Sequence, residues 1–370
     1  MTRTWKPVPW SHSTNVYEVN TRQYTEEGTF EAFRKKHLPR LHDMGVHTLW
    51  FMPVTPISVA GRKGTMGSYY ACSDYCAVNP EFGTMDDFKA MVSDAHARGM
   101  KVIIDWVANH TGVDHRWTLE HPGFYKRNAE GKFYDANGWD DVIDLDYSNA
   151  SMRLSMIEAM AWWVREADID GFRCDMAMLV EVGFWKQART ALEPIKPLFW
   201  LAELDQWDDR EYLEVFDAAY TWTWMRATEA HYRSGSWQLS GLKDVLHGYA
   251  SMEPKGAMRA WFTSNHDENS WNGTEYDKFG AMAVPLSVFN ATWDGLPLIY
   301  SGQELPNQKR LEFFEKDTIE WTQGIQLHEH FRKLLGLRKQ HPALRGGDDA
   351  VGTQWVPVGE NVPVLAYVRR

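Results

Sequence analysis

The segment Val102-Ile103-Ile104-Asp105, which leads on to Asn109-His110, is an apolar, strand-like run that ends in an acid and then a histidine. Three later segments repeat this form: Asp170-Gly171-Phe172-Arg173-Cys174-Asp175, Phe199-Trp200-Leu201-Ala202-Glu203 and Trp261-Phe262-Thr263-Ser264-Asn265-His266-Asp267. Such a run is built to be buried, and ionised side chains are rare in a core unless they are paired or used. Four in succession predict parallel strands whose C-terminal ends converge on one polar pocket, as in barrel enzymes.

Beyond these segments, apolar runs alternate with amphipathic helical stretches, which is typical of βα units and a parallel sheet. Helices are predicted at 85–98 and 151–167, and Gly99 is placed to end the first of them. Strands are predicted at 15–23, 47–54, 101–107, 170–175, 199–204, 218–224, 260–266 and 296–301. Their number is that of a (β/α)8 TIM barrel, which needs about 250 residues.

Two stretches depart from a minimal barrel, which is therefore assigned to residues 1–110 and 151–345. Residues 111–150 are polar and rich in Gly, Asn, Asp and aromatic residues, so they are interpreted as a functional excursion after the third strand. After about residue 345 the pattern changes to short β-like pieces. Two strands do not form a stable domain alone. Residues 346–370 are therefore expected to lean on the barrel or to begin an incomplete C-terminal β domain.

Composition limits the classes of partner. The 370 residues include 39 Lys and Arg against 50 Asp and Glu, a net charge of −11, which argues against nucleic acid as a partner. No apolar run reaches the roughly 18 residues of a membrane span, so no membrane partner is expected. The start has no apolar leader and the three cysteines are predicted to be free thiols. Both features favour a cytoplasmic location.

Arg173 and Asp175 lie two residues apart on one predicted strand, so their side chains point to the same side. A guanidinium beside a carboxylate is expected to lower the pKa of Asp175 and keep it ionised, as a nucleophile requires. A buried structural ion pair is the open alternative. Glu203 follows apolar and aromatic residues, so burial is expected to raise its pKa by about two units from roughly 4.3 and make it a general acid. The alternative is a glutamate facing water at a strand end.

His266 and Asp267 are adjacent, so both cannot share one face of a strand and the chain must break into a loop there. His110 ends its segment in the same way. As neutral imidazoles, the two histidines are predicted to donate hydrogen bonds to hydroxyl groups, with purely structural histidines as the alternative. Trp139 and Trp271 lie among polar loop residues, where an indole suits stacking on a sugar face better than core packing.

A nucleophilic carboxylate with a protonated carboxylic acid is the pair that retaining glycosidases place about 5–5.5 Å apart across the scissile bond. A metal site is the competing interpretation, because carboxylate, amide and imidazole groups are all metal ligands. Its candidate ligands are Asp105, Asn109, His110 and Asp175. The arginine next to Asp175 argues against a cation there, so no metal site is predicted.

These residues resemble the conserved regions of glycoside hydrolase family thirteen, the α-amylase family, and the resemblance spans roughly residues 14–345. The matching segments are Asp105-Trp106-Val107-Ala108-Asn109-His110, Gly171-Phe172-Arg173-Cys174-Asp175, Glu203 and Asn265-His266-Asp267. The resemblance implies a barrel with a small B domain at 111–150 and the start of a C-terminal β domain. It implies Asp175 as nucleophile, Glu203 as acid/base and Asp267 as transition-state stabiliser. The implied substrate-binding residues are Arg173, His110, His266, Tyr70 and Asp105.

One departure from the family pattern bears on calcium. Many α-amylases follow the nucleophile with a Lys-His pair whose histidine helps to bind calcium, and here those positions are Met178-Leu179. The short 111–150 segment also removes other usual calcium ligands. These changes count against calcium at Asn109, so no cofactor is expected to be required.

The resemblance implies a retaining hydrolase that cleaves α-1,4-glucosidic bonds in starch-like α-glucans or maltooligosaccharides through a covalent glycosyl-enzyme intermediate. The nearest alternative is a transglycosylase or sugar isomerase of the same family, which passes the same intermediate to a sugar. A catalytically inactive carbohydrate-binding barrel is a more distant alternative, because relatives of that kind usually lose catalytic acids and this chain retains them.

Overall fold

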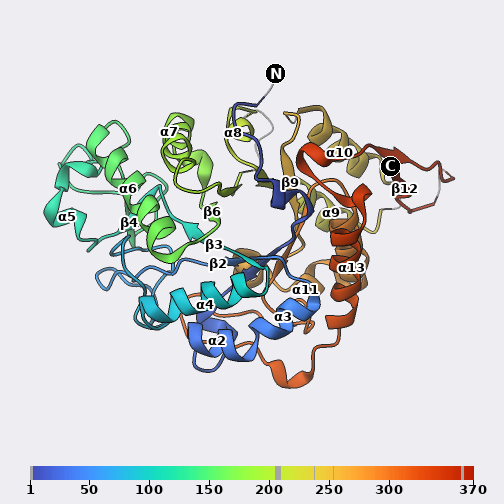
Figure 1. Ribbon diagram of the computed structural model, residues 1–370, viewed down its shortest axis with the longest axis horizontal. Coiled ribbons are helices and arrows are strands. Elements are labelled where there is room, and N and C mark those ends of the chain that lie inside the picture. The colour runs from blue at the N-terminus through green and yellow to red at the C-terminus, as the bar shows by residue number, and fades with distance from the viewer. Residues whose placement is uncertain (1–2, 205–209, 237, 253, 360–361) are drawn as a thin grey trace.

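The core of the protein is a closed barrel of parallel strands surrounded by helices (Figure 1). The computed structural model describes residues 3–204, 210–236, 238–252, 254–359 and 362–370. Around the barrel the order is β1(Val16–Val19), β2(Thr48–Phe51), β3(Lys101–Trp106), β6(Gly171–Cys174), β7(Phe199–Ala202), β8(Ala218–Tyr220), β9(Met258–Trp261) and β10(Leu296–Tyr300), which pairs back with β1. The predicted (β/α)8 barrel is confirmed, and each predicted strand overlaps an observed one.

The strand predicted at 260–266 is shifted, because β9 covers Met258–Trp261. Its pairing with β10 consists of Ala260 with Leu296 and Trp261 with Pro297. Beyond Trp261 no strand register continues, so residues 262–267 leave the sheet at the carboxyl end of the barrel. The polar residues of this segment therefore lie on the rim.

The helices between the strands cover the outside of the barrel. The helix predicted at 85–98 is α4, which begins at a capping box in which Thr84 and Asp87 exchange hydrogen bonds. The helix predicted at 151–167 is α6, which the Asn149 side chain caps. The helices of the outer layer are α1(Thr21–Tyr24), α2(Phe30–Lys36), α3(Leu38–Met44), α4(Met85–Ala97), α6(Ala150–Ala167), α7(Val182–Leu192), α8(Arg210–Val215), α9(Trp222–Ser234), α10(Ser240–Met252), α11(Glu275–Phe279), α12(Ala283–Thr292) and α13(His328–Gln340).

The excursion after β3 forms a small lobe at the edge of the barrel (Figure 1). It contains the antiparallel pair β4(His110–Gly112) and β5(Val142–Asp144), with the short helix α5(Trp117–Glu120) between them. Buried aromatic side chains fill it: Trp117, Phe124 and Tyr125. The pairing of His110 with Asp144 brings both ends of the excursion back to the carboxyl end of β3. The assignment of 111–150 as a separate domain stays a prediction.

The C-terminal residues form one antiparallel hairpin, β11(Thr353–Trp355) with β12(Tyr367–Arg369). The rings of Trp355 and Tyr367 lie 5.3 and 4.8 Å from that of Trp293, just after α12, so the hairpin is supported by the helical layer. Within 346–370, residues 360–361 lie outside the described residues. Among the helices of the described ranges, none has both the length and the apolar character needed to cross a bilayer.

Two features of β6 fix its place beside β7. Asp170, just before β6, lies at the end of the strand remote from Asp175 and contacts His96, Lys101 and Lys196 at 2.6–3.2 Å. This acid has an ion-pairing role away from the carboxyl ends. At Gly171, an added Cβ would lie 2.0 Å from the Phe199 carbonyl oxygen. Only glycine therefore allows the strands that carry Asp175 and lead to Glu203 to approach this closely.

Candidate active site

The carboxyl ends of the strands surround one cavity of about 400 Å³. This volume lies near the lower end of the range for small-molecule sites, roughly 300–1,000 Å³. Six of the predicted site residues line it: Tyr70, His110, Asp175, Glu203, His266 and Asp267. Arg173 and Asp105 lie behind this lining and contact it. The four segments that suggested a shared pocket therefore do converge.

Arg173 organises the acidic groups. Its guanidinium is fully buried and donates through Nη1 to Asp175 Oδ1 at 2.7 Å and to Asp105 Oδ1 at 2.9 Å. Its Nη2 donates to Glu203 Oε2 at 2.8 Å. Because one planar guanidinium holds both Asp175 and Glu203, those two carboxyl oxygens lie within about 8 Å of each other. A separation of about 10 Å or more, which would exclude attack and proton donation across one bond, is ruled out.

The expected lowering of the Asp175 pKa is wrong. Burial raises the pKa of Asp175 to about 6, and the opposing charge of Arg173 does not cancel this effect. The sequence shows the arginine beside Asp175 but not that Asp105 and Glu203 share the same cation. Asp175 is therefore ionised only above about pH 6.

The expected rise of the Glu203 pKa agrees with the structure. Burial raises the pKa of Glu203 to about 7, although Arg173 acts in the opposite direction. The contact with Arg173 was not foreseen, because the sequence near Glu203 contains no adjacent cation. The backbone N–H of Met176 also donates to Glu203 Oε2, at 2.9 Å. Burial therefore raises the pKa of both acids, and Arg173 opposes the rise at both.

His266 differs from the neutral imidazole that was predicted. Despite its burial, the carboxylates of Asp267 and Glu18 hold the pKa of His266 well above its usual value. Burial alone would raise the pKa of Asp267, but His266 lowers it, so Asp267 is ionised. Glu18 lies 248 residues away in sequence, which is why the charge on His266 was not predicted.

His110 does match the neutral form that was expected, because burial lowers its pKa to about 4. Its ring meets the Trp139 indole edge-on at 5.4 Å. Trp139 and Trp271 both line the cavity and stay 37% and 50% exposed. They are thus placed as the stacking interpretation requires.

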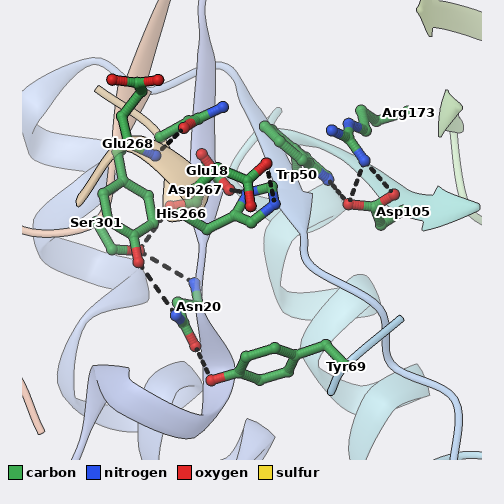
Figure 2. A network of polar contacts seen from close by, with 12 residues as sticks. Glu18, Asn20, Trp50, Tyr69, Asp105, Arg173, His266, Asp267, Glu268 and Ser301 are labelled. Atoms are coloured by element: carbon green, nitrogen blue, oxygen red, sulfur yellow. Dashed lines mark hydrogen bonds and ion pairs between the residues drawn. The ribbon is translucent and has the colours of Figure 1, made fainter. Parts of the chain in front are cut away.

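Tyr70 lies between the acids and the histidine. Its hydroxyl donates to Asp105 Oδ2 at 3.0 Å and lies 2.8 Å from His266 Nε2, while its ring stacks on that of His266 at 5.3 Å. Trp50, which was not predicted, donates its indole N–H to the same Asp105 oxygen at 3.2 Å (Figure 2). Burial raises the pKa of Asp105 to about 6.

Several cavity residues were missed because tertiary contacts alone bring them there. Lys63 lies in the loop after β2 and reaches across to the excursion, with Nζ 2.6 Å from Asp140 and 3.1 Å from Asp141. Phe313 follows β10 and its ring lies 5.2 Å from that of Trp271. The aromatic pair Phe313-Phe314 was the only available sequence signal, and it does not differ from core packing. These contacts link the loops that surround the cavity.

The side chains near Asn109 are paired with one another. Asn109 Nδ2 donates to Asp144 Oδ1 at 3.4 Å, and the other oxygen of Asp144 is paired with Lys126 Nζ at 3.1 Å. The ammonium group therefore already neutralises the nearest carboxylate, where calcium would need free oxygen ligands. No group of three metal-binding side chains was found among the described residues.

A model of the α-amylase catalytic domain matches residues 26–134 and 123–326. The α-amylase MalA of Haloarcula japonica is 26% identical over 385 residues, which cover 99% of this chain and 55% of the relative. The maltogenic α-amylase of Bacillus acidopullulyticus is 26% identical and is covered over 59% of its length. The chain thus spans between half and two thirds of the length of these curated relatives.

Solved structures agree. An α-amylase from Lactobacillus plantarum superimposes with a TM-score of 0.88 at 30% identity, covering 97% of this chain and 86% of that one. A noncanonic maltogenic α-amylase, AmyB of Thermotoga neapolitana, gives a TM-score of 0.86 at 32% identity, covering 96% and 82%. The residues that the family model matches include the strands from β2 to β10 and every residue that lines the cavity. The chain therefore belongs to the α-amylase family.

Proposed function

We propose that the protein is a retaining glycoside hydrolase that cleaves α-1,4-glucosidic bonds in starch-like α-glucans or maltooligosaccharides. One observation carries this proposal: a single buried guanidinium holds Asp175 and Glu203 at one cavity, where burial raises the pKa of both acids. Carboxyl groups whose pKa values are strongly shifted by burial and a shared charged partner in one cavity are typical of active sites.

In the first step, a carboxylate oxygen of Asp175 attacks the anomeric carbon and the bond from that carbon to the glycosidic oxygen breaks. Glu203 gives its proton to that oxygen, so the leaving sugar departs as a neutral alcohol. Among the described residues, Arg173 and the Met176 backbone both donate to Glu203 Oε2, which leaves Oε1 as the oxygen that carries the proton. The product is a glycosyl ester on Asp175 and an ionised Glu203.

In the second step, ionised Glu203 takes a proton from water as the water oxygen attacks the same carbon. The ester bond to Asp175 breaks and both acids return to their starting states. Between the steps, positive charge develops on the sugar ring. Ionised Asp267 is the group placed to stabilise it, while Tyr70 and His110 line the same cavity.

The substrate class rests on the family and on the exposed indoles. Trp139 and Trp271 offer apolar faces beside charged groups, which suits the C–H face and hydroxyl edge of glucosyl units. Two of the relatives are named maltogenic α-amylases, which supports short maltose-based substrates or products.

The test compares Asp175→Asn and Glu203→Gln with the wild-type protein on maltotriose and longer maltooligosaccharides. Each variant is expected to lose activity by at least about 10²–10⁴-fold, the contribution typical of such groups. α-Maltosyl fluoride separates the roles, because fluoride leaves without a proton: Glu203→Gln should still release fluoride in a first turnover, and Asp175→Asn should not. Near-wild-type turnover of maltotriose by either variant would end the proposal.

Chromatography of the products tests hydrolysis against sugar transfer. Shorter glucans alone are expected, whereas longer oligosaccharides or isomerised disaccharides as main products would identify a transglycosylase or isomerase. A control variant, Glu158→Gln, changes a carboxylate on α6 whose side chain is 69% exposed and outside the cavity lining, and it should retain turnover.

A further inference from the structure

Glu18 is a buried acid on β1 that no step of the proposed reaction uses. It is fully buried, and its Oε1 lies 2.6 Å from His266 Nδ1 (Figure 2). Its second oxygen, Oε2, is buried without a hydrogen-bond partner among the described residues. A buried carboxylate oxygen without a hydrogen-bond partner lowers the stability of the folded state. The contact between Glu18 and His266 is therefore a candidate for a functional role.

Carboxylates face both ring nitrogens of His266. On one side, Nδ1 lies 2.6 Å from Glu18 Oε1. On the other side, Nε2 lies 3.3 Å from Asp267 Oδ2 and 2.8 Å from the Tyr70 hydroxyl, which also contacts Asp105. With a carboxylate near each nitrogen the doubly protonated ring is favoured, and the pKa of His266 is held well above its usual value.

The charged groups around this cation come from several elements. Glu18 on β1 faces Nδ1, and Asp267 Oδ2 lies 3.3 Å from Nε2. Arg173 on β6 lowers the pKa of Glu18, as His266 does, and His266 also lowers the pKa of Asp105 on β3, which lies behind Tyr70. Two carboxylates thus hold His266 directly, and only Glu18 lies outside the cavity lining.

We propose that Glu18 is a positioning residue of the reaction, which holds His266 as a doubly protonated donor aimed at Asp267 and the bound sugar. The inference rests on the proposed function and adds a residue to it. The Glu18–His266 ion pair has no net charge, although it is buried. The N–H of His266 Nε2 still points toward the groups around the sugar. Asp267 then stays ionised and oriented as positive charge develops on the ring.

The test is Glu18→Gln, because glutamine keeps the size of the side chain and an oxygen that can accept from Nδ1. Without the negative charge, burial is expected to remove the proton from His266 near neutral pH. The kcat on maltotriose should then fall by on the order of 10²-fold with little change in KM, and the alkaline limb of kcat/KM should move to lower pH.

Glu304→Gln is the matched control. Glu304 is also a fully buried carboxylate, but it is bound by Tyr17 at 2.7 Å and Arg40 at 2.9 Å and does not line the cavity. This variant should leave the pH profile of kcat/KM where it is. A shift of equal size in both variants would show a general effect of removing a buried acid and would overturn the inference.

Two further measurements do not depend on how well the variants turn over substrate. In the wild-type protein, ¹⁵N NMR of the histidine side chains should show both His266 nitrogens bearing hydrogen at pH 7, and a neutral ring would overturn the inference. In the His266→Gln background, Glu18→Gln should cause no further loss of kcat, whereas an independent loss would show that Glu18 does not act through His266. Loss of the proposed function itself would appear separately, as retained turnover in Asp175→Asn.

Discussion

Replacing Arg173 by methionine should make the stability of the protein depend strongly on pH. The guanidinium is fully buried and is the shared cation of Asp105, Asp175 and Glu203. Methionine fills a similar volume without charge and leaves three carboxyl groups in the core. Removing one partner of a buried ion pair costs about 3–5 kcal/mol, because the remaining charge has no compensation.

The direction with pH follows from proton binding. In the wild-type protein the pKa values of these acids are about 6, 6 and 7, above the roughly 4 of an unfolded chain. The folded state therefore holds more protons between about pH 4 and 7, and these groups lower the stability as the pH rises through that window. Without Arg173 the folded pKa values rise further and the window extends above pH 7. Each carboxyl that stays protonated in the folded state lowers the free energy of unfolding by about 1.4 kcal/mol for every pH unit in that window.

Urea unfolding followed by tryptophan fluorescence at pH 5.5 and pH 8 measures the effect. The variant should be close to wild type at pH 5.5 and about 3–5 kcal/mol less stable at pH 8, provided the slope of the transition is unchanged. Arg189→Met is the control, because Arg189 is also fully buried but pairs with a single buried acid, Asp217, at 2.9 Å. Its loss of stability should vary less with pH. Equal, pH-independent losses in the two variants would refute the assignment of Arg173 as the shared cation.

Three further outcomes are expected. The kcat/KM for maltotriose should be bell-shaped, with an acid limb near pH 6 from ionisation of Asp175 and an alkaline limb near pH 7 from loss of the Glu203 proton; a flat profile across pH 5–8 would contradict the acid pair. Chelation with EDTA should leave the Tm unchanged, since Lys126 already pairs with Asp144, and a drop in Tm that calcium restores would show this to be wrong. Gly171→Ala should destabilise the fold by about 1–3 kcal/mol and reduce kcat, because the new Cβ would press on the Phe199 carbonyl that lies 2.0 Å away; wild-type values of both would refute the close contact between β6 and β7.

The sequence alone is enough to predict which residues at the ends of strands line the cavity. Asp175 and Glu203 each follow an apolar run, and parallel strands place their carboxyl ends at one rim. The sequence does not predict the cavity residues whose side chains are positioned by loops. Lys63 and Phe313 carry no motif and reach the cavity through contacts with the excursion and with Trp271.

The sequence by itself determined the (β/α)8 architecture and the convergence of the four segments on one cavity, because alternating apolar periodicity and polar strand ends are local properties of the chain. Only the tertiary structure decided the charge states. The pKa of Asp175 is raised because the group is fully buried and the charge of Arg173 does not cancel that effect. The pKa of His266 is raised because Asp267 and Glu18, the latter from the first strand, lie against its ring. A pKa depends on burial and on every charge within a few ångströms, and those neighbours come from strands far apart in sequence.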